Sequence, residues 1–349
     1  MTCKGCGIKL QYDDRDKVGY SPKENAQYCQ RCFRIKHYDD LMYSMKTGIK
    51  PDEVLKKINE IDGLVVWVCD LFDFEASMIE GMNRHLVNKD IILVASKRDL
   101  LPNDISDLKI TNFIKGILKE NGIKVNAILI TSKEEKNNGE QIVNVLKEQA
   151  NGKPIIVVGK ANVGKSTFLN LLSSSDVLTK SKYPGTTLDF NEIIISNQVF
   201  IDTPGIEVKN SMLMLLDEKQ LSCIIPQSRV KPLIYQLEKD QSIALGGLIR
   251  IDLFNCNKAS LVVYASDRLV IHRSKQSNAD DLWANHKGVL LIPSTDEKMV
   301  TTTAKAYYDK MDIVIDGLGW VSINSNVSSI KITHPKDVNI RFRKAMLWI

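Results

Sequence analysis

No apolar run in the sequence approaches the roughly 20 residues that a bilayer-spanning helix needs. The longest apolar runs, such as 63–69 and 154–159, have the length of strands. The N-terminal residues MTCKGCGIKL lack the apolar segment of a secretion signal. We therefore expect no membrane span and a cytoplasmic location.

Internal repeats and low-complexity segments are also missing, so a repeat architecture is not expected. The five histidines are scattered, and none has a partner at the spacing of a metal site or a catalytic pair. The sequence has no haem-ligand, flavin or arginine-pocket signature, which argues against a metabolic enzyme such as a nitric-oxide synthase.

The composition is that of a soluble globular protein, with 44% hydrophobic and 26% charged residues. A chain of 349 residues is long enough for two or three domains. The formal net charge of +5 would tolerate an anionic partner, but ordinary surface charge explains it equally well.

Three regions differ in their sequence patterns. Residues 1–50 hold paired cysteines and many charges, and residues 51–210 alternate strand-like apolar runs with helical segments. This alternation predicts a mostly parallel α/β sheet with helices on both faces. The predicted strands are 63–70, 91–96, 127–131, 154–159 and 198–202, and the predicted helices are 51–61, a segment after Asn103, and 139–149.

The third region, 211–349, begins with one amphipathic stretch, 212–221, and continues as short apolar runs. These runs predict a β-rich domain, either antiparallel β or α+β. The predicted strands are 248–254, 259–266, 268–273, 288–293, 311–323 and 329–334.

A phosphate-loop pattern, G-x-x-x-x-G-K-[ST], begins at Gly159 and ends at Ser166. It follows a predicted strand and opens a predicted helix, as the motif requires. Glycine lets backbone amides approach phosphate oxygens, and the helix N-terminus adds positive potential. Lys165 would reach the β- and γ-phosphates, and the Ser166 hydroxyl would bind Mg²⁺. The predicted phosphate-binding set is Gly159, Asn162, Val163, Gly164, Lys165, Ser166 and Thr167.

Two short motifs follow the phosphate loop. PGTTLD spans 184–189, and we favour Thr187 over Thr186 as the threonine that closes on Mg²⁺ and the γ-phosphate. DTPG spans 202–205, where Asp202 would hold Mg²⁺ through water and the Gly205 amide would contact the γ-phosphate. Each motif alone is weak, but the three in this order and context are a strong signature.

Selection of guanine requires a carboxylate that accepts from the base N1–H and the exocyclic amine together. Asp99 is the candidate carboxylate, and the Ser132 amide would meet the guanine carbonyl. Both lie in loops at strand ends, formed by Ser96, Lys97 and Asp99 and by Thr131, Ser132 and Lys133. The predicted ligand is therefore GTP or GDP.

Both guanine loops precede the phosphate loop, whereas they follow it in an ordinary GTPase. A sheet can be cut and rejoined at surface positions while its packed core is kept. The order therefore predicts a circularly permuted P-loop GTPase fold in which DTPG is the last part of the nucleotide domain. The C-terminal domain would begin just after it, well placed to respond to the nucleotide.

Four of the seven cysteines form two CxxC pairs, Cys3 with Cys6 and Cys29 with Cys32. Two such pairs can close a tetrahedral structural zinc site, and a module of about 50 residues would bury too little core to fold without metal. A rubredoxin-like iron site is the alternative. Four basic residues around the second pair either contact RNA phosphates or are simply solvated: Arg31, Arg34, Lys36 and His37.

The order SKRD, TSK, GKANVGKS, PGTT, DTPG resembles that of the circularly permuted GTPases of ribosome assembly. With the paired cysteines in front, the chain is similar to the YqeH family and its plant and mitochondrial nitric-oxide-associated relatives. The resemblance covers nearly the whole chain and is strongest over 1–40 and 60–206. It implies a GTP-hydrolysing switch in small (30S) subunit assembly that binds rRNA or ribosomal protein through its flanking domains.

Three positions set expectations for affinity and rate. The family usually has asparagine where Ser96 stands, and losing one net hydrogen bond of about 1 kcal/mol would weaken binding roughly fivefold. Ile206 stands where many GTPases place a water-orienting glutamine, so slow intrinsic hydrolysis is expected. The resemblance implies that Asn162 holds K⁺ near the β- and γ-phosphates; the alternative is that Asn162 merely stabilises the loop. The expected catalytic set is Asn162, Lys165 and Thr187.

Basic residues gather at two places in the third region: Arg268, His272, Arg273 and Lys275, and Arg341, Arg343 and Lys344 with Trp348 close by. Basic and aromatic side chains on a β surface are compatible with RNA binding. Acidic residues are interleaved with them, so the domain is not uniformly basic.

The second functional hypothesis is a nucleotide-binding scaffold whose hydrolysis is degenerate. Ser96 and Ile206 favour it, because both depart from the usual GTPase residues. The intact residues Lys165, Ser166 and Asp202 argue against it.

Overall fold

The computed structural model describes residues 9–13, 20–21, 23–24, 26–27, 48–134, 138–173, 177–182 and 190–347, with the backbone alone for 177–182. The chain divides into two compact units, Met1–Thr47 and Gly48–Ile349. In the first unit Leu10 is buried and Gln11 pairs with Tyr20. The predicted zinc ligands and the basic residues around them lie outside the described residues: Cys3, Cys6, Cys29, Cys32, Arg31, Arg34, Lys36 and His37.

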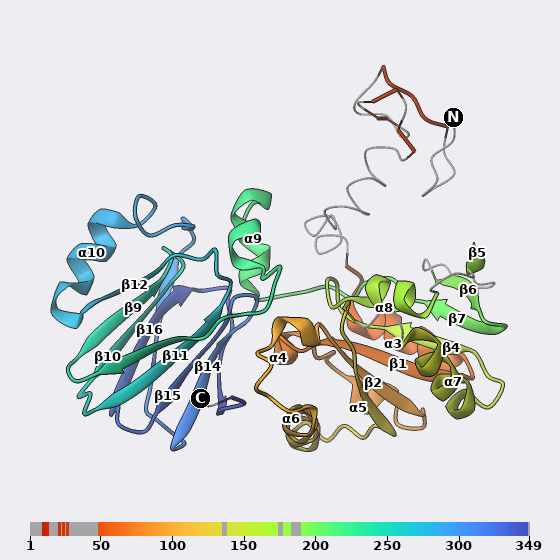
Figure 1. Cartoon of the computed structure of the whole chain (residues 1–349), viewed down its shortest axis with the longest axis horizontal. Helices are drawn as coiled ribbons and strands as arrows, with labels where there is room; N and C mark the ends of the chain where they lie inside the picture. The colour runs from red at the N-terminus through yellow and green to blue at the C-terminus, as the bar shows by residue number, and fades with distance from the viewer. Residues whose placement is uncertain are drawn as a thin grey trace. The chain divides into compact units, whose positions relative to one another are not determined.

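The second unit begins with one seven-stranded sheet in the order β3-β2-β1-β4-β7-β6-β5 (Figure 1). Its strands are β1 (Leu64–Asp70), β2 (Ile91–Ser96), β3 (Ala127–Ile130), β4 (Ile155–Val158), β5 (Val177–Lys182), β6 (Asn191–Ile195) and β7 (Gln198–Asp202). The neighbouring strands β3, β2, β1, β4 and β7 run parallel to one another. At the β7 end of the sheet, β6 pairs antiparallel with β7, and β5 pairs antiparallel with β6. The predicted mostly parallel sheet is confirmed, whereas β5 and β6 were missed by the sequence reasoning.

Helices cover both faces of this sheet, as the alternation of patterns predicts. Odd-numbered residues of β1, Val65 and Trp67 among them, share a core with α3 (Pro51–Glu60) and α6 (Asp107–Glu120). Even-numbered residues such as Val66 share a second core with α7 (Gly139–Ala150) and α8 (Lys165–Leu172). The short helices α4 (Phe74–Ser77) and α5 (Met82–His85) add Phe74 and Met82 to the first core.

The remaining strands form two antiparallel sheets of five strands, β12-β9-β10-β16-β13 and β17-β14-β15-β11-β8 (Figure 1). This arrangement confirms the predicted β-rich architecture. The elements are α9 (Glu218–Ile224), β8 (Leu233–Leu237), β9 (Gln241–Leu245), β10 (Ile249–Phe254), β11 (Ala259–Ala265), β12 (Ile271–Lys275), α10 (Ala279–His286), β13 (Met299–Ala304), β14 (Lys310–Ile315), β15 (Gly319–Asn324), β16 (Ser329–Pro335) and β17 (Ile340–Lys344).

The predicted strand at 288–293 is wrong. The amides of Val289, Leu290 and Leu291 all donate to the carbonyl of His286, which closes a turn and leaves these groups unavailable for a strand ladder. Leu291 is buried, but Val289 and Leu290 are exposed. The apolar run 288–293 resembles a strand in sequence, but its backbone hydrogen bonds are those of a turn.

Two other predicted segments are divided in the structure. The stretch 212–221 breaks at Asp217, which forms a capping box with Gln220 and starts α9. The run 311–323 folds as the hairpin β14–β15, turning through Gly317 and Gly319 at φ 83° and 129°. Such positive φ values favour glycine.

The sheet that contains β14 and β15 shares an apolar core with the seven-stranded sheet. Trp320 and Tyr264 stack with ring centroids 4.8 Å apart, and Phe72, which follows β1, lies 5.5 Å from Trp320. All three belong to the core that includes α3 and α6. In the part of the chain that the structure describes, no helix is long and apolar enough to cross a membrane.

Candidate nucleotide-binding site

The phosphate loop lies between β4 and α8 and is packed closely against β1. A Cβ on Gly159 would lie 2.7 Å from the Val68 carbonyl oxygen, so this position has no room for a side chain. Asn162 and Gly164 have φ values of 65° and 92°, which bend the loop into the start of α8. The glycines of the motif are thus required by the backbone.

Lys165 connects the phosphate loop to DTPG, because its ammonium group donates to the Thr203 carbonyl. Burial lowers the pKa of Lys165, and the nearby Asp202 carboxylate opposes that shift. The Thr203 hydroxyl in turn donates to the Val157 carbonyl at 2.9 Å. The two phosphate-facing motifs are therefore held together at the ends of β4 and β7.

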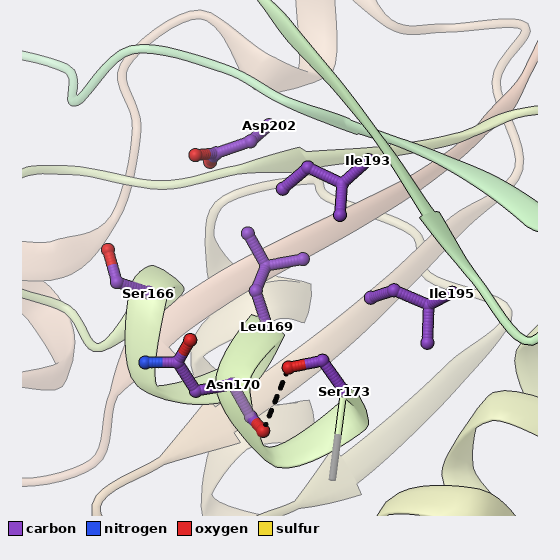
Figure 2. A pocket seen from close by; sticks show the side chains of 7 residues that line it. All are labelled: Ser166, Leu169, Asn170, Ser173, Ile193, Ile195 and Asp202. Atoms are coloured by element: carbon purple, nitrogen blue, oxygen red, sulfur yellow. Dashed lines mark hydrogen bonds between the residues drawn. The ribbon is translucent and has the colours of Figure 1, made fainter. Parts of the chain in front are cut away.

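Ser166 and Asp202 line one pocket, together with Leu169, Asn170, Ser173, Ile193 and Ile195 (Figure 2). Ser166 lies in the first turn of α8 and Asp202 at the end of β7. A hydroxyl and a carboxylate are oxygen ligands of the kind that Mg²⁺ prefers. This pair fits the predicted Mg²⁺ site, whereas Thr187, its third predicted member, lies outside the described residues.

The backbone beyond DTPG is fixed on two sides. Ile206 N–H donates to Gly159 O at 3.2 Å, and Ala161 N–H donates to Ile206 O at 2.9 Å. On the other side, Ile49 N–H donates to Gly205 O at 3.1 Å. The Ile206 side chain is 0% exposed. Position 206 is therefore a core position, and its side chain cannot orient a water molecule.

The two guanine loops meet at Asp99, which is 6% exposed. Its Oδ1 accepts from the Ser132 hydroxyl at 3.3 Å and from the Lys133 amide at 3.4 Å. The backbones are also joined, since Arg98 N–H donates to Thr131 O at 3.1 Å. The structure thus brings together the loops that the sequence placed at two strand ends.

Ser96 links the first guanine loop to the phosphate loop. Its hydroxyl oxygen lies 3.0 Å from Cys69 O and 2.5 Å from Val163 O, and it donates to one of them at a time. A Cβ on Gly164 would lie 3.3 Å from the same oxygen. The hydroxyl is therefore a close contact between the two loops, and the expected loss of affinity at this position stays a prediction.

Sequence reasoning missed two residues beside the site. The carboxylate of Asp70, at the end of β1, accepts hydrogen bonds from the Lys97 ammonium group at 2.7 Å and from the Phe72 amide at 2.9 Å. Lys160, inside the phosphate-loop pattern, donates to Ala76 O at 2.8 Å, and burial lowers its pKa. An acidic end on an apolar strand was the available signal for Asp70; for Lys160 there was none.

Two of the basic residues considered for RNA binding are engaged in ion pairs. Arg343 contacts Glu75 and lies 3.0 Å from Asp312, and Arg341 lies 2.8 Å from Asp316. In the other group Arg273 donates to the Gln236 carbonyl and lies over a tyrosine ring. Trp348 lies outside the described residues. Among the residues that the structure describes, no group of three or more His, Cys, Asp or Glu is placed to hold a metal ion.

The sequence is 34% identical to the uncharacterized protein YqeH of Bacillus subtilis (strain 168), and the alignment covers 99% of each chain. The chain belongs to the YqeH family. Residues 258–346 match the family description "YqeH-like, C-terminal", and residues 154–242 match "50S ribosome-binding GTPase". A YqeH-family chain with this match is a P-loop GTPase, which implies GTP or GDP and Mg²⁺ as ligands.

More distant relatives extend to plants. The NO-associated protein 1, chloroplastic/mitochondrial, of Arabidopsis thaliana is 24% identical over 97% of this chain and 72% of its own length. Among solved structures, the GNP-bound YlqF from T. maritima matches 46% of this chain and 60% of its own, with 20% identity and a TM-score of 0.31. The resemblance to the YqeH family that the motifs indicated is confirmed.

Proposed function

We propose that the chain is a GTP-hydrolysing switch that acts in assembly of the small ribosomal subunit. One observation carries the nucleotide part of this proposal. The guanine loops and the phosphate loop lie at the ends of neighbouring parallel strands, and the Ser96 hydroxyl joins them. Ligands of open α/β sheets bind outside the carboxyl ends of the strands, as these loops require.

Asp99 would select guanine by accepting from N1–H and the exocyclic amine, which adenine does not offer as a pair. Ser132 and Lys133 already orient this carboxylate. Ser96, Lys97 and Thr131 would complete the base site.

At the phosphate end, Lys165 would contact the β- and γ-phosphates, and Ser166 and Asp202 would hold Mg²⁺, which supplies positive charge for phosphoryl transfer. Thr187 and the Gly205 amide complete the proposed set near the γ-phosphate. Asn162, in its left-handed turn, would hold K⁺ there in place of an arginine finger. With Ile206 buried in the core, hydrolysis without K⁺ or a partner should be slow.

The flanking parts of the chain would bind the ribosomal particle. We propose a zinc module over 1–50, the permuted GTPase domain over 51–210 and a β-rich domain for RNA or protein over 211–349. The zinc assignment rests on the spacing of Cys3, Cys6, Cys29 and Cys32. Metal analysis of the purified chain should give zinc and not iron, and a serine at Cys3 or Cys29 should lower the zinc content.

The ribosomal role is tested by co-sedimentation of the chain with purified 30S and 50S particles. The runs would use a non-hydrolysable GTP analogue, GDP, or no nucleotide. Binding to 30S particles that is stronger with the analogue than with GDP supports the proposal. Because the matched GTPase family is described as 50S ribosome-binding, preferential binding to 50S particles would contradict the small-subunit assignment. Binding to neither would remove the ribosomal role.

A further inference from the structure

The segment between α9 and β8 runs along the first guanine loop. We call residues 226–230 the linker. The amide of Val230 donates to Leu100 O at 2.9 Å, and Nε of Arg229 donates to Leu101 O at 3.3 Å. Val230 is 2% exposed and shares a core with Leu100 and Leu101. This part of the linker is therefore packed against, and hydrogen-bonded to, the loop that carries Asp99.

The same linker also contacts the second guanine loop. The Lys133 ammonium group donates to Gln227 O at 3.2 Å and lies 3.4 Å from Oδ2 of Asp99. An Arg229 nitrogen lies 3.8 Å from a carboxylate oxygen of Glu134. Lys133 thus joins the linker directly to the carboxylate that is proposed to read the base.

The carbonyl of Leu101 shows how the first loop is held from two sides. It accepts from Arg229 of the linker and, at 3.4 Å, from Arg98 of the loop itself. Arg98 also donates to Pro102 O at 3.2 Å. Because Arg98 and Arg229 both donate to the Leu101 carbonyl, the loop that carries Asp99 is held by its own side chain and by the linker.

We propose that the linker positions the guanine-reading carboxylate, with Arg229 as its positioning residue. The inference rests on the proposed guanine site. Two hydrogen bonds from one carboxylate to one base edge require narrow geometry, so a loop held in place discriminates bases better than a free one. Because β8 begins at Leu233, three residues after Val230, whatever displaces that strand would also act on the affinity for the base.

The test compares GDP, inosine diphosphate and inorganic tripolyphosphate on the full chain. Inosine lacks the exocyclic amine, so it reports one of the two hydrogen bonds to Asp99. Arg229→Ala should weaken GDP binding roughly threefold to tenfold, the effect of about one lost hydrogen bond. The preference for GDP over inosine diphosphate should shrink, and tripolyphosphate binding should not change. Arg229→Lys should restore part of the preference.

Lys89→Ala is the matched control, because Lys89 also donates to a backbone carbonyl, that of Ile61, but both residues precede the amino ends of β2 and β1. It should leave all three affinities unchanged. An Arg229→Ala variant with the wild-type preference for GDP would overturn the inference, as would an equal loss for tripolyphosphate, which indicates general loosening. If the wild type itself does not prefer GDP to ADP, the proposed guanine site fails first, so the two failures are distinguishable.

Discussion

At the scale of single residues, the surroundings decide what a side chain does. Ser96 departs from the asparagine of related GTPases, yet its hydroxyl joins the guanine loop to the phosphate loop. Ile206 stands at a position that is catalytic in many GTPases, yet it is a core residue here. Asp73 is a carboxylate near other carboxylates, and it accepts a hydrogen bond from the Gly317 amide at 2.9 Å.

Replacement of Ser96 by alanine should weaken GDP binding about fivefold and lower Tm. The change removes a buried hydrogen bond of about 1 kcal/mol to the Val163 or Cys69 carbonyl. Calorimetric titration with GDP and a thermal melt measure the two effects. Ser222→Ala, which removes an exposed hydroxyl, should change neither. An unchanged affinity would show that the Ser96 contact does not position the phosphate loop.

Replacement of Asp99 by asparagine should lower GDP affinity at least about a hundredfold. Two charge-assisted hydrogen bonds of about 1.5–3 kcal/mol each are lost. Xanthosine diphosphate should bind the variant better than the wild type, because xanthine presents a carbonyl where guanine presents its amine. Competition binding with the two nucleotides measures the exchange. Equal GDP affinity in both proteins would remove Asp99 from the base site.

Asp73 predicts a pH dependence of stability. Burial and then the negative charges of Asp316, Asp70 and Glu75 raise its pKa well above the ordinary value, while the Gly317 amide opposes the shift. Its contribution to stability is therefore present at low pH and is lost as pH rises through the folded-state pKa. Asp73→Asn keeps an acceptor for Gly317 and carries no charge.

This variant should have a higher Tm than the wild type at pH 8. The gain should shrink as pH falls toward about 4, where an ordinary aspartate is half protonated. Thermal melts across that range measure it, with Asp267→Asn at an exposed turn as the control. A gain that does not vary with pH would show that the charge of Asp73 is not the cause.

At the scale of elements, β17 and the segment after β1 are joined by a buried charge group. Arg343 lies between Glu75 and Asp312, and its guanidinium is 4.7 Å from the Phe113 ring centre. Removal of the Arg343 charge would leave the largely buried carboxylates of Glu75 and Asp312 without this partner. Ion pairs of this kind are costly to break from one side.

Arg343→Ala should therefore destabilise the chain by about 3–5 kcal/mol. Arg341→Ala is the comparison, since the Arg341 side chain is 43% exposed and its pair with Asp316 should contribute less. Denaturant unfolding of both variants measures the difference. Equal losses would show that the Arg343 group contributes no more to stability than the more exposed Arg341 pair.

Strands that read as continuous apolar runs were the ones that could be predicted. β1, β2 and β4 read as continuous apolar runs because both faces of their sheet are covered. β8 and β17 escaped detection, since as edge strands they carry exposed or charged side chains such as Leu233 and Arg343.

The residues of the candidate site also divide into those that the sequence could predict and those that it could not. The phosphate and guanine loops have local motifs, so their residues could be named from the sequence. The contacts of Lys160 with Ala76 and of Arg229 with Leu101 join positions 84 and 128 residues apart. Such pairings depend on how the chain folds back, and no local pattern encodes them.

At the scale of the whole molecule, the loops of the proposed nucleotide site all lie on one sheet although their order in the chain is permuted. The C-terminal strands follow DTPG in the chain, and the linker that leads to them lies against both guanine loops. In a nucleotide-dependent switch, the chain connection after DTPG and the linker contacts would both carry the nucleotide state to the C-terminal strands. A scaffold that does not hydrolyse GTP would not change state in this way.

The most direct test is turnover of GTP and ATP in KCl and in NaCl, with and without small ribosomal subunits. The account predicts GTP-selective turnover that is slow in NaCl and rises with K⁺ or with subunits, and Asn162→Ala should lose the response to K⁺. Binding of GTP without turnover under every condition would contradict the account and favour a scaffold with degenerate hydrolysis.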